Sequence, residues 1–421
     1  MIMELNTKIQ EFLLRHSVEK FLEYVKVWTT SDEDSSTFPS TPNQFDLGKL
    51  LIEQLKEIGL INLTHDEFGY VYGDLPASKG YEHINPIGLI AHLDTSGAVS
   101  GKDVEPLIRK NYDGGEISFP KDKDLIIHIK DAPELEEYVG MDLITASGDT
   151  LLGADDKAGI AEIITACTAW QKFPELIHGP IVVCFTPDEE TGRGTQNIKK
   201  NRLPEICYTM DGSKMGELEF ECFDAWLATF KFKGLSVHTG KAKDRMINSI
   251  NIATRYFSSV PEFESPEHTE DREGFFHLYY LNGNAEETSA KMLIRDHEEI
   301  KNERRIDLLK SLKVYFEERY PGVKIELDFT HQYKNMLRYL EKDKRVIDIA
   351  AKAIEQAGLE VVSNPIRGGT DGARLSEMGI PTPNIFSGGL LFHSKKEFIP
   401  TIALKKASEV IINLAYLWTK N

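Results

Sequence analysis

Hydrophobic and polar positions along the chain predict buried strands that alternate with helices. Apolar residues recur at helical spacing from Phe45 to Ile58, and Gly59 follows as a stop signal. Continuous apolar runs with polar ends are typical of buried strands. Such runs predict a hairpin at 61–75 and strands at 87–95, 180–190 and 205–212, and residues 153–170 predict a loop that enters a helix. Strands alternating with helices indicate an α/β domain with a mostly parallel sheet.

The pattern changes after about residue 222. The predicted elements are then a strand at 225–234, a helix at 246–259, strands at 275–283 and 291–297, a charged helix at 298–320 and a strand at 323–329. This βαββαβ order is ferredoxin-like. A predicted helix at 343–360 restores the α/β character. We therefore expect an α/β domain formed by residues 1–221 and 334–421, interrupted by a smaller ferredoxin-like α+β domain at 222–333.

Composition narrows the class of partner. The chain has 421 residues, with 49 basic and 67 acidic side chains and a net charge of −18. This charge argues against nucleic acid and anionic membranes as partners. The first residues predict an amphipathic helix instead of a signal peptide, and no stretch reaches the ~18 consecutive apolar residues of a membrane helix. Four cysteines without CxxC spacing do not suggest a structural zinc site, and the expected location is the cytoplasm.

Three consecutive carboxylates, Asp188, Glu189 and Glu190, end the apolar run that begins at residue 181. Like charges this close resist ionisation unless a cation balances them. Other strand and loop ends offer partners for such a cation. They are His92 and Asp94 in "AHLDT", Asp155 and Asp156 in "GADDKAG", Asp211 in "TMDGS", and His393 in "LLFHSKKE".

Each of these residues alone has a structural explanation. A single histidine is more often structural than a ligand, and an aspartate before a helix can simply cap it. Together they point to one place, because the carboxyl ends of parallel strands meet at one edge of an open α/β sheet. Carboxylates with imidazoles suit zinc, or the related ions manganese and cobalt. Two such ions bridged by one carboxylate can activate water for amide hydrolysis.

The motifs that carry this chemistry resemble those of the co-catalytic di-zinc peptidases, the family that includes aminoacylases, carboxypeptidases and desuccinylases. They are "GLIAHLDTS", "TLLGADDKAGIAEI", "FTPDEETGRG", "DGSKMGELEFE", "IRGGTDGARLSEMGIPTPN" and "FHSKKEF". They span about residues 88 to 398 in the family's order. The two long motifs "LLGADDKAGIAEI" and "RGGTDGA" are similar to those of the family's tripeptide aminopeptidases, and residues 222–333 would be the family's lid and dimerisation domain.

The resemblance implies a role for each metal-site residue. His92 and Asp211 would bind one zinc ion, Glu190 and His393 the other, and Asp155 would bridge the two. Asp94 would orient the metal-bound histidine, and Glu189 would be the general base that takes a proton from water. Asp188 has no role in this scheme, and we expect its side chain to be solvated, with loop orientation as the alternative.

The resemblance also implies contacts with a peptide. His238 would help to stabilise the oxyanion, and Asn248, Arg295 and Arg367 would lie near the substrate. A guanidinium suits the C-terminal carboxylate of a peptide because it can bind both oxygens. The alternatives are an exposed ion pair for Arg295 and a structural turn for Arg367.

Two positions depart from the family's pattern. Thr239 stands where relatives usually have proline, and Lys396 stands where they often have a second histidine. Neither change affects an expected metal ligand, but both could alter substrate preference.

The expected function is a di-zinc aminopeptidase that removes the N-terminal residue of tripeptides, with short peptides as partners and a homodimer as an option. The alternatives are a related dipeptidase, carboxypeptidase or N-acyl amino acid deacylase. A catalytically silent peptide-binding protein is the non-enzyme alternative, although Glu189 and all five expected metal ligands are present.

Overall fold

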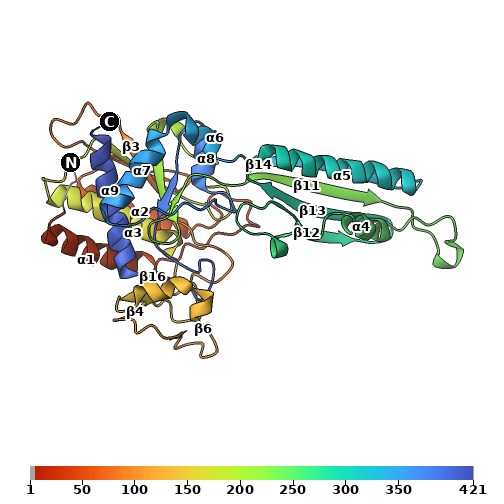
Figure 1. The fold of residues 1–421 in the computed structure, drawn as a ribbon, viewed down its shortest axis with the longest axis horizontal. Helices are drawn as coiled ribbons and strands as arrows, with labels where there is room; N and C mark the ends of the chain where they lie inside the picture. Colours follow the sequence, from red (N-terminus) through yellow and green to blue (C-terminus); the bar gives the residue numbers. More distant parts are fainter. Residues whose placement is uncertain (1–4, 421) are drawn as a thin grey trace. The chain divides into compact units, whose positions relative to one another are not determined.

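The computed structural model describes residues 5–420, which divide into two compact units (Figure 1). The larger unit contains the chain up to Phe220, Arg338–Asn364 and the chain from Thr370 onward. The smaller unit contains Glu221–Leu337 and Pro365–Gly369. Residues 365–369 therefore group with the smaller unit, whereas the sequence pattern placed them in the larger one.

A seven-stranded sheet forms the centre of the larger unit. Its strands, in spatial order, are β1 (Ile61–His65), β2 (Val71–Leu75), β8 (Ile181–Thr186), β3 (Ile87–His92), β9 (Cys207–Gly212), β15 (Asn384–Phe386) and β10 (Leu218–Glu219). The four strands β8, β3, β9 and β15 run parallel, and the outer strands pair antiparallel. The expected mostly parallel arrangement thus holds for the centre of the sheet, where β3 is buried along its whole length.

Helices cover this sheet. They are α1 (Thr7–Tyr24), α2 (Gln44–Ile58), α3 (Ala154–Lys172), α7 (Arg345–Gln356), α8 (Asp371–Glu377) and α9 (Thr401–Trp418), with the short α6 (Leu337–Leu340) at the unit boundary. Helix α3 lies against β3 and β9 and packs on α1 and α9. It is apolar and buried on almost every side, as expected for a helix enclosed by other elements. The predicted N-terminal amphipathic helix is α1, whose first turn is capped by the Asn6 side chain.

Residues 97–145, where the sequence shows Gly-rich turns and short β-prone runs without a defined arrangement, contain short strands and two 3-10 helices, Ile129–Asp131 and Pro133–Tyr138. β4 (Leu107–Arg109) and β7 (Leu143–Thr145) form a three-stranded sheet with β16 (Phe398–Pro400), and β5 (Ile117–Ser118) pairs with β6 (Ile126–Ile127). Strand β7 of this region pairs with β16, about 250 residues later in the chain. Local sequence patterns cannot reveal a pairing between such distant segments.

The smaller unit is one four-stranded antiparallel sheet with two helices. Its strands are ordered β12 (Phe275–Gly283), β13 (Glu287–Asp296), β11 (Asp224–Lys233) and β14 (Lys324–Tyr333). Helices α4 (Ser249–Phe257) and α5 (Glu299–Arg319) supply Tyr256, Leu309 and Phe316 to its core. The element order is the predicted βαββαβ. Among residues 5–420, no helix is long and apolar enough to span a bilayer.

Candidate metal centre

Parallel strand pairing brings the predicted site residues to one edge of the seven-stranded sheet. In the register, His92 at the end of β3 lies opposite Thr186 at the end of β8. The three carboxylates 188–190 follow directly after β8, and Asp211 is the penultimate residue of β9, the other neighbour of β3. The first turn of α3 supplies Asp155, and the loop before β16 supplies His393.

Asp155 lies between the two histidines. Its Oδ1 is 2.8 Å from His92 Nε2, and its Oδ2 is 3.1 Å from His393 Nε2. His92 Nε2 also lies 3.5 Å from Asp211 Oδ1, and His393 Nε2 lies 3.0 Å from Glu190 Oε2. The five residues expected to bind metal therefore form one connected cluster, with a single carboxylate shared by its two halves.

The ligand atoms are close enough to surround cations. Those of His92, Asp155 and Glu190 lie within 4.8 Å of one another, and so do those of His92, Asp156 and Asp211. Glu190 Oε1 is buried and has no hydrogen-bond partner. A buried carboxylate oxygen without a donor is costly unless a cation meets it, so the residues present fit a bound metal ion.

Asp155 and Asp156 can be distinguished by their hydrogen bonds. Asp156 accepts the backbone N–H of His92 at 3.1 Å and that of Gly159 at 3.2 Å, one with each carboxylate oxygen. Asp155 instead directs both oxygens at imidazoles. The geometry therefore favours Asp155 as the bridging ligand and gives Asp156 the task of joining α3 to the end of β3.

The carboxylates of this cluster outnumber the imidazoles that could balance their negative charge. Burial raises the pKa of Glu189 well above its ordinary value, with Asp211 adding to the effect. Burial, with the charge of Asp155, raises the pKa of Glu190 to about 7. Hydrogen bonds to Asp155 and Glu190 raise the pKa of His393 to about 11. These raised pKa values mean that the groups retain protons, and bound divalent cations would neutralise the same negative charge instead. Imidazole nitrogens and carboxylate oxygens are ligands that zinc, manganese and cobalt accept.

Asp94 holds the metal-site loops together. Its carboxylate accepts the backbone N–H of Glu189 at 3.0 Å and that of Glu190 at 3.2 Å. His92 Nδ1 lies 3.0 Å from the Asp94 backbone carbonyl and 3.4 Å from its carboxylate. The carbonyl is therefore the nearer partner of the histidine, and the carboxylate fixes the position of the two glutamates.

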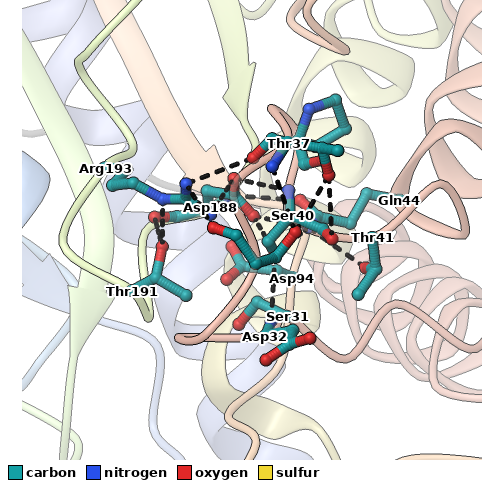
Figure 2. A network of polar contacts seen from close by, with 12 residues as sticks. Ser31, Asp32, Thr37, Ser40, Thr41, Gln44, Asp94, Asp188, Thr191 and Arg193 are labelled. Atoms are coloured by element: carbon teal, nitrogen blue, oxygen red, sulfur yellow. Dashed lines mark hydrogen bonds and ion pairs between the residues drawn. The ribbon is translucent and has the colours of Figure 1, made fainter.

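The expectation of a solvated Asp188 was wrong. Its side chain is fully buried and accepts hydrogen bonds from Ser40 N (2.7 Å), Ser40 Oγ (2.5 Å) and Gln44 Nε2 (2.7 Å). Arg193 Nη2 completes the set at 3.2 Å. Figure 2 shows Asp188 at the centre of this network. Asp188 also has a φ of 58°, so the chain turns sharply just before the two glutamates.

Two other buried carboxylates contact the site and were missed. The backbone N–H of Asp371 donates to Glu189 Oε1 at 3.2 Å, and its carboxylate accepts from Thr186 Oγ1 at 2.7 Å. Glu397, at 1% exposure, accepts the backbone N–H groups of residues 152–155. Both residues lie inside motifs that carried the family resemblance, but nothing in the sequence alone indicates what they contact.

The four residues expected to contact a peptide all belong to the smaller unit. His238 is exposed and Asn248 caps α4 through its side-chain oxygen. Arg295 is 8% exposed and donates to the carbonyls of Trp226 and Ile294 and to Gln332.

Arg367 donates to the carbonyls of residues 269, 271 and 273, and its guanidinium lies over Phe223 and Phe275. This geometry supports the alternative of a structural turn. The alternative of an exposed ion pair at Arg295 is contradicted, because the residue is 8% exposed and its described hydrogen-bond partners include no carboxylate.

The two departures from the family's pattern lie in separate units. Lys396 forms an ion pair with Asp131 at 2.8 Å in the larger unit, so its charge is balanced locally. Thr239 begins a short 3-10 helix, Thr239–Lys241, in the smaller unit.

Comparisons with known proteins identify the family of this chain. The sequence profile of peptidase family M20/M25/M40 matches residues 151–416. A protein named peptidase T from Clostridium acetobutylicum is 47% identical over 404 residues, which cover 96% of this chain and 99% of the relative. A peptidase T from Listeria monocytogenes is 45% identical over 402 residues, which cover 95% and 98%.

A solved structure shows the same fold. The crystal structure of aminopeptidase PepT from Bacillus cereus matches with a TM-score of 0.76 at 20% identity, covering 97% of this chain and 99% of that one. The profile covers more than half of the chain and the named relatives cover nearly all of it. The chain therefore belongs to peptidase family M20/M25/M40.

Proposed function

We propose that this chain is an aminopeptidase that removes the N-terminal residue of tripeptides at a centre of two zinc ions. The observation that carries the proposal is the position of Asp155, whose two oxygens reach two different histidines at 2.8 and 3.1 Å. The relatives named peptidase T, at 45–47% identity over nearly the whole chain, support the peptide substrate.

His92 and Asp211 would hold one ion, Glu190 and His393 the other, and Asp155 both. Two divalent ions bound there would polarise the peptide carbonyl and lower the pKa of water. Asp94 keeps the backbone of the two glutamates in place through its bonds to their amides.

Glu189 would act as the general base. Burial raises its pKa, and its Oε1 is anchored by the N–H of Asp371, so its carboxylate is held at a fixed orientation. It would take a proton from the attacking water and deliver it to the leaving amine. Until cations neutralise its neighbours, its high pKa favours the protonated form, so we expect its basicity to depend on the loaded site.

The smaller unit is proposed as a lid that completes the substrate site, with His238, Asn248 and Arg295 as candidate contacts. Arg295 is the strongest of these, because a guanidinium that is 8% exposed and bonded only to neutral groups among its described partners suits an incoming carboxylate. Arg367 stays a candidate, although backbone carbonyls already occupy both of its terminal nitrogens. A homodimer through this unit stays a prediction.

We also infer a cytoplasmic location, because all four cysteines are buried free thiols, which suits a reducing compartment.

The test is hydrolysis of Ala-Ala-Ala by zinc-loaded protein, beside Ala-Ala, Ala-Ala-Ala-Ala and N-acetyl-Ala-Ala-Ala, each with and without chelator. Chelator-sensitive cleavage of the free tripeptide alone is the expected result. Cleavage of the dipeptide or the acetylated peptide instead would move the protein to a dipeptidase, carboxypeptidase or deacylase specificity. Two bound ions without any cleavage would support the peptide-binding alternative.

A further inference from the structure

The buried carboxylate of Glu397 binds the loop that carries Asp155. Its Oε2 accepts the backbone N–H groups of Leu152 and Gly153, each at 2.8 Å. Its Oε1 accepts those of Ala154 at 2.7 Å and Asp155 at 3.2 Å. One side chain thus satisfies four consecutive amides, two just before α3 and the first two of the helix, which have no acceptor within the helix.

Glu397 also lies four residues after His393, on the same loop before β16. Through its side chain and its own backbone, it connects the segment that presents Asp155 to the segment that presents His393. These two residues lie 3.1 Å apart, Asp155 Oδ2 to His393 Nε2, although 238 positions separate them in the chain.

The contact cannot be explained as ordinary helix capping alone. Gly153, the residue before α3, has a φ of 84° and has no side chain to cap the helix, so the acceptor must come from elsewhere in the fold. Within the first turn of α3, Asp155 and Asp156 have non-helical backbone angles. The start of the helix is therefore irregular at Asp155, the residue that faces both histidines, and the Glu397 carboxylate holds this backbone in place.

We propose that Glu397 is a positioning residue that sets the separation of Asp155 and His393, and so the affinity of the centre for its second divalent cation. The proposal rests on the proposed metal function, since it assigns Glu397 an effect on ions held by these two residues. A carboxylate is needed because two oxygens must accept four N–H groups. An amide at this position would offer one oxygen and turn its own N–H groups toward donors.

The test is a titration of ion-free protein with Zn²⁺ against a chromophoric chelator, together with the visible absorption spectrum of the Co²⁺-loaded protein. In Glu397→Gln we expect the weaker of two Zn²⁺ sites to lose about 10- to 100-fold in affinity, the range for groups that orient metal ligands, and the Co²⁺ bands to shift. Glu397→Asp retains the charge but is one methylene shorter, so it should fold and show a loss near the lower end of that range, about 10-fold.

Glu409→Gln is the matched control. Glu409 is also a buried glutamate of the larger unit, at 3% exposure, but it pairs with Lys405 and Lys406 on α9. This variant should lower stability without changing Zn²⁺ affinity by more than about twofold, the effect expected away from the ligands.

Wild-type affinity and an unchanged Co²⁺ spectrum in Glu397→Gln would overturn the proposal. If that variant does not fold, wild-type affinity in Glu397→Asp would overturn it. Failure of the wild-type protein to bind two ions would instead refute the metal function itself, and the positioning role with it.

Discussion

Replacing Asp188 with asparagine removes a charge from a fully buried site. The carboxylate accepts three hydrogen bonds from Ser40 and Gln44 and faces the guanidinium of Arg193. Asparagine retains one acceptor oxygen and turns an NH₂ group toward the remaining donors. Hydrogen bonds to a charged group contribute about 1.5–3 kcal/mol each, so losing two of them gives a destabilisation of about 3–6 kcal/mol. This is close to the roughly 3–5 kcal/mol lost when a buried ion pair is broken.

For the larger unit, which contains Asp188, that loss of unfolding free energy corresponds to a fall in Tm of roughly 5–10 °C. The assay is thermal unfolding of the ion-free protein, so that metal binding does not contribute, followed by kcat/KM for the tripeptide with the metal restored. We also expect at least a tenfold loss of kcat/KM, since a misplacement of about 1 Å at reacting groups can cost more than this and Glu189 is the next residue in the chain.

The control is Asp103→Asn, because Asp103 is exposed and has nearly the same backbone conformation, with a φ of 57°. It undergoes the same change of charge without losing a buried network. Equal Tm and equal turnover in the two variants would show that the Asp188 network neither stabilises the unit nor holds the glutamates.

Three further changes test separate parts of the scheme. Glu189→Gln should retain both metals and lose about 10²- to 10⁴-fold in kcat, the contribution of a general base; near-normal turnover by the metal-replete variant excludes that role. His393→Ala should reduce bound zinc to about one ion per chain by elemental analysis; two fully occupied sites would count against it as a ligand. Burial, with the charge of Lys20, lowers the pKa of His16 to about 4 in the folded chain. Between about pH 6.5 and pH 4 the unfolded chain therefore binds this proton more readily than the folded chain does, and stability declines as pH falls through this range. Discounted for partial exposure, this amounts to about 1 kcal/mol between about pH 7.5 and pH 5, and the corresponding fall in Tm should be smaller in His16→Gln; an identical fall contradicts the assignment.

The sequence predicts well what local pattern controls. Apolar runs identified β3, β8 and β9, and polar residues at their ends were expected at one sheet edge because parallel strands share an edge. The structure confirms the α/β fold and places His92, Asp155, Asp211 and His393 in one cluster. These predictions succeed because period and strand polarity are properties of short segments.

The rest depends on contacts between distant segments. The residues next to Asp188 in the chain are typical of an exposed charge. Its burial depends on hydrogen bonds from Ser40 and Gln44, which lie at least 144 positions earlier. Glu397 reads as one more charge after two lysines until four amides some 240 positions earlier surround it. A buried carboxylate and a solvated one have the same local sequence signature, because what distinguishes them is the set of donors supplied by the fold.

The two candidate arginines of the smaller unit give contrasting predictions. Arg295 is nearly buried, donates to two carbonyls and an amide, and also contacts Tyr333, whose ring its guanidinium lies over. Its described hydrogen-bond partners include no carboxylate. Arg367 already donates from both terminal nitrogens to the backbone of residues 269–273 and lies over Phe223 and Phe275. We therefore predict that Arg295 binds the carboxylate of a peptide and that Arg367 holds a loop.

Arg295→Gln should raise KM for Ala-Ala-Ala by about tenfold to a hundredfold, the equivalent of one charge-assisted contact. It should have little effect on the C-terminal amide of the same peptide, which has no carboxylate to lose. Arg367→Gln should lower Tm and change KM equally for the peptide acid and for its C-terminal amide. If Arg295→Gln weakens the acid and the amide alike, its guanidinium does not bind the peptide's C-terminus, and a preference for the acid that disappears in Arg367→Gln would assign that contact to Arg367 in its place.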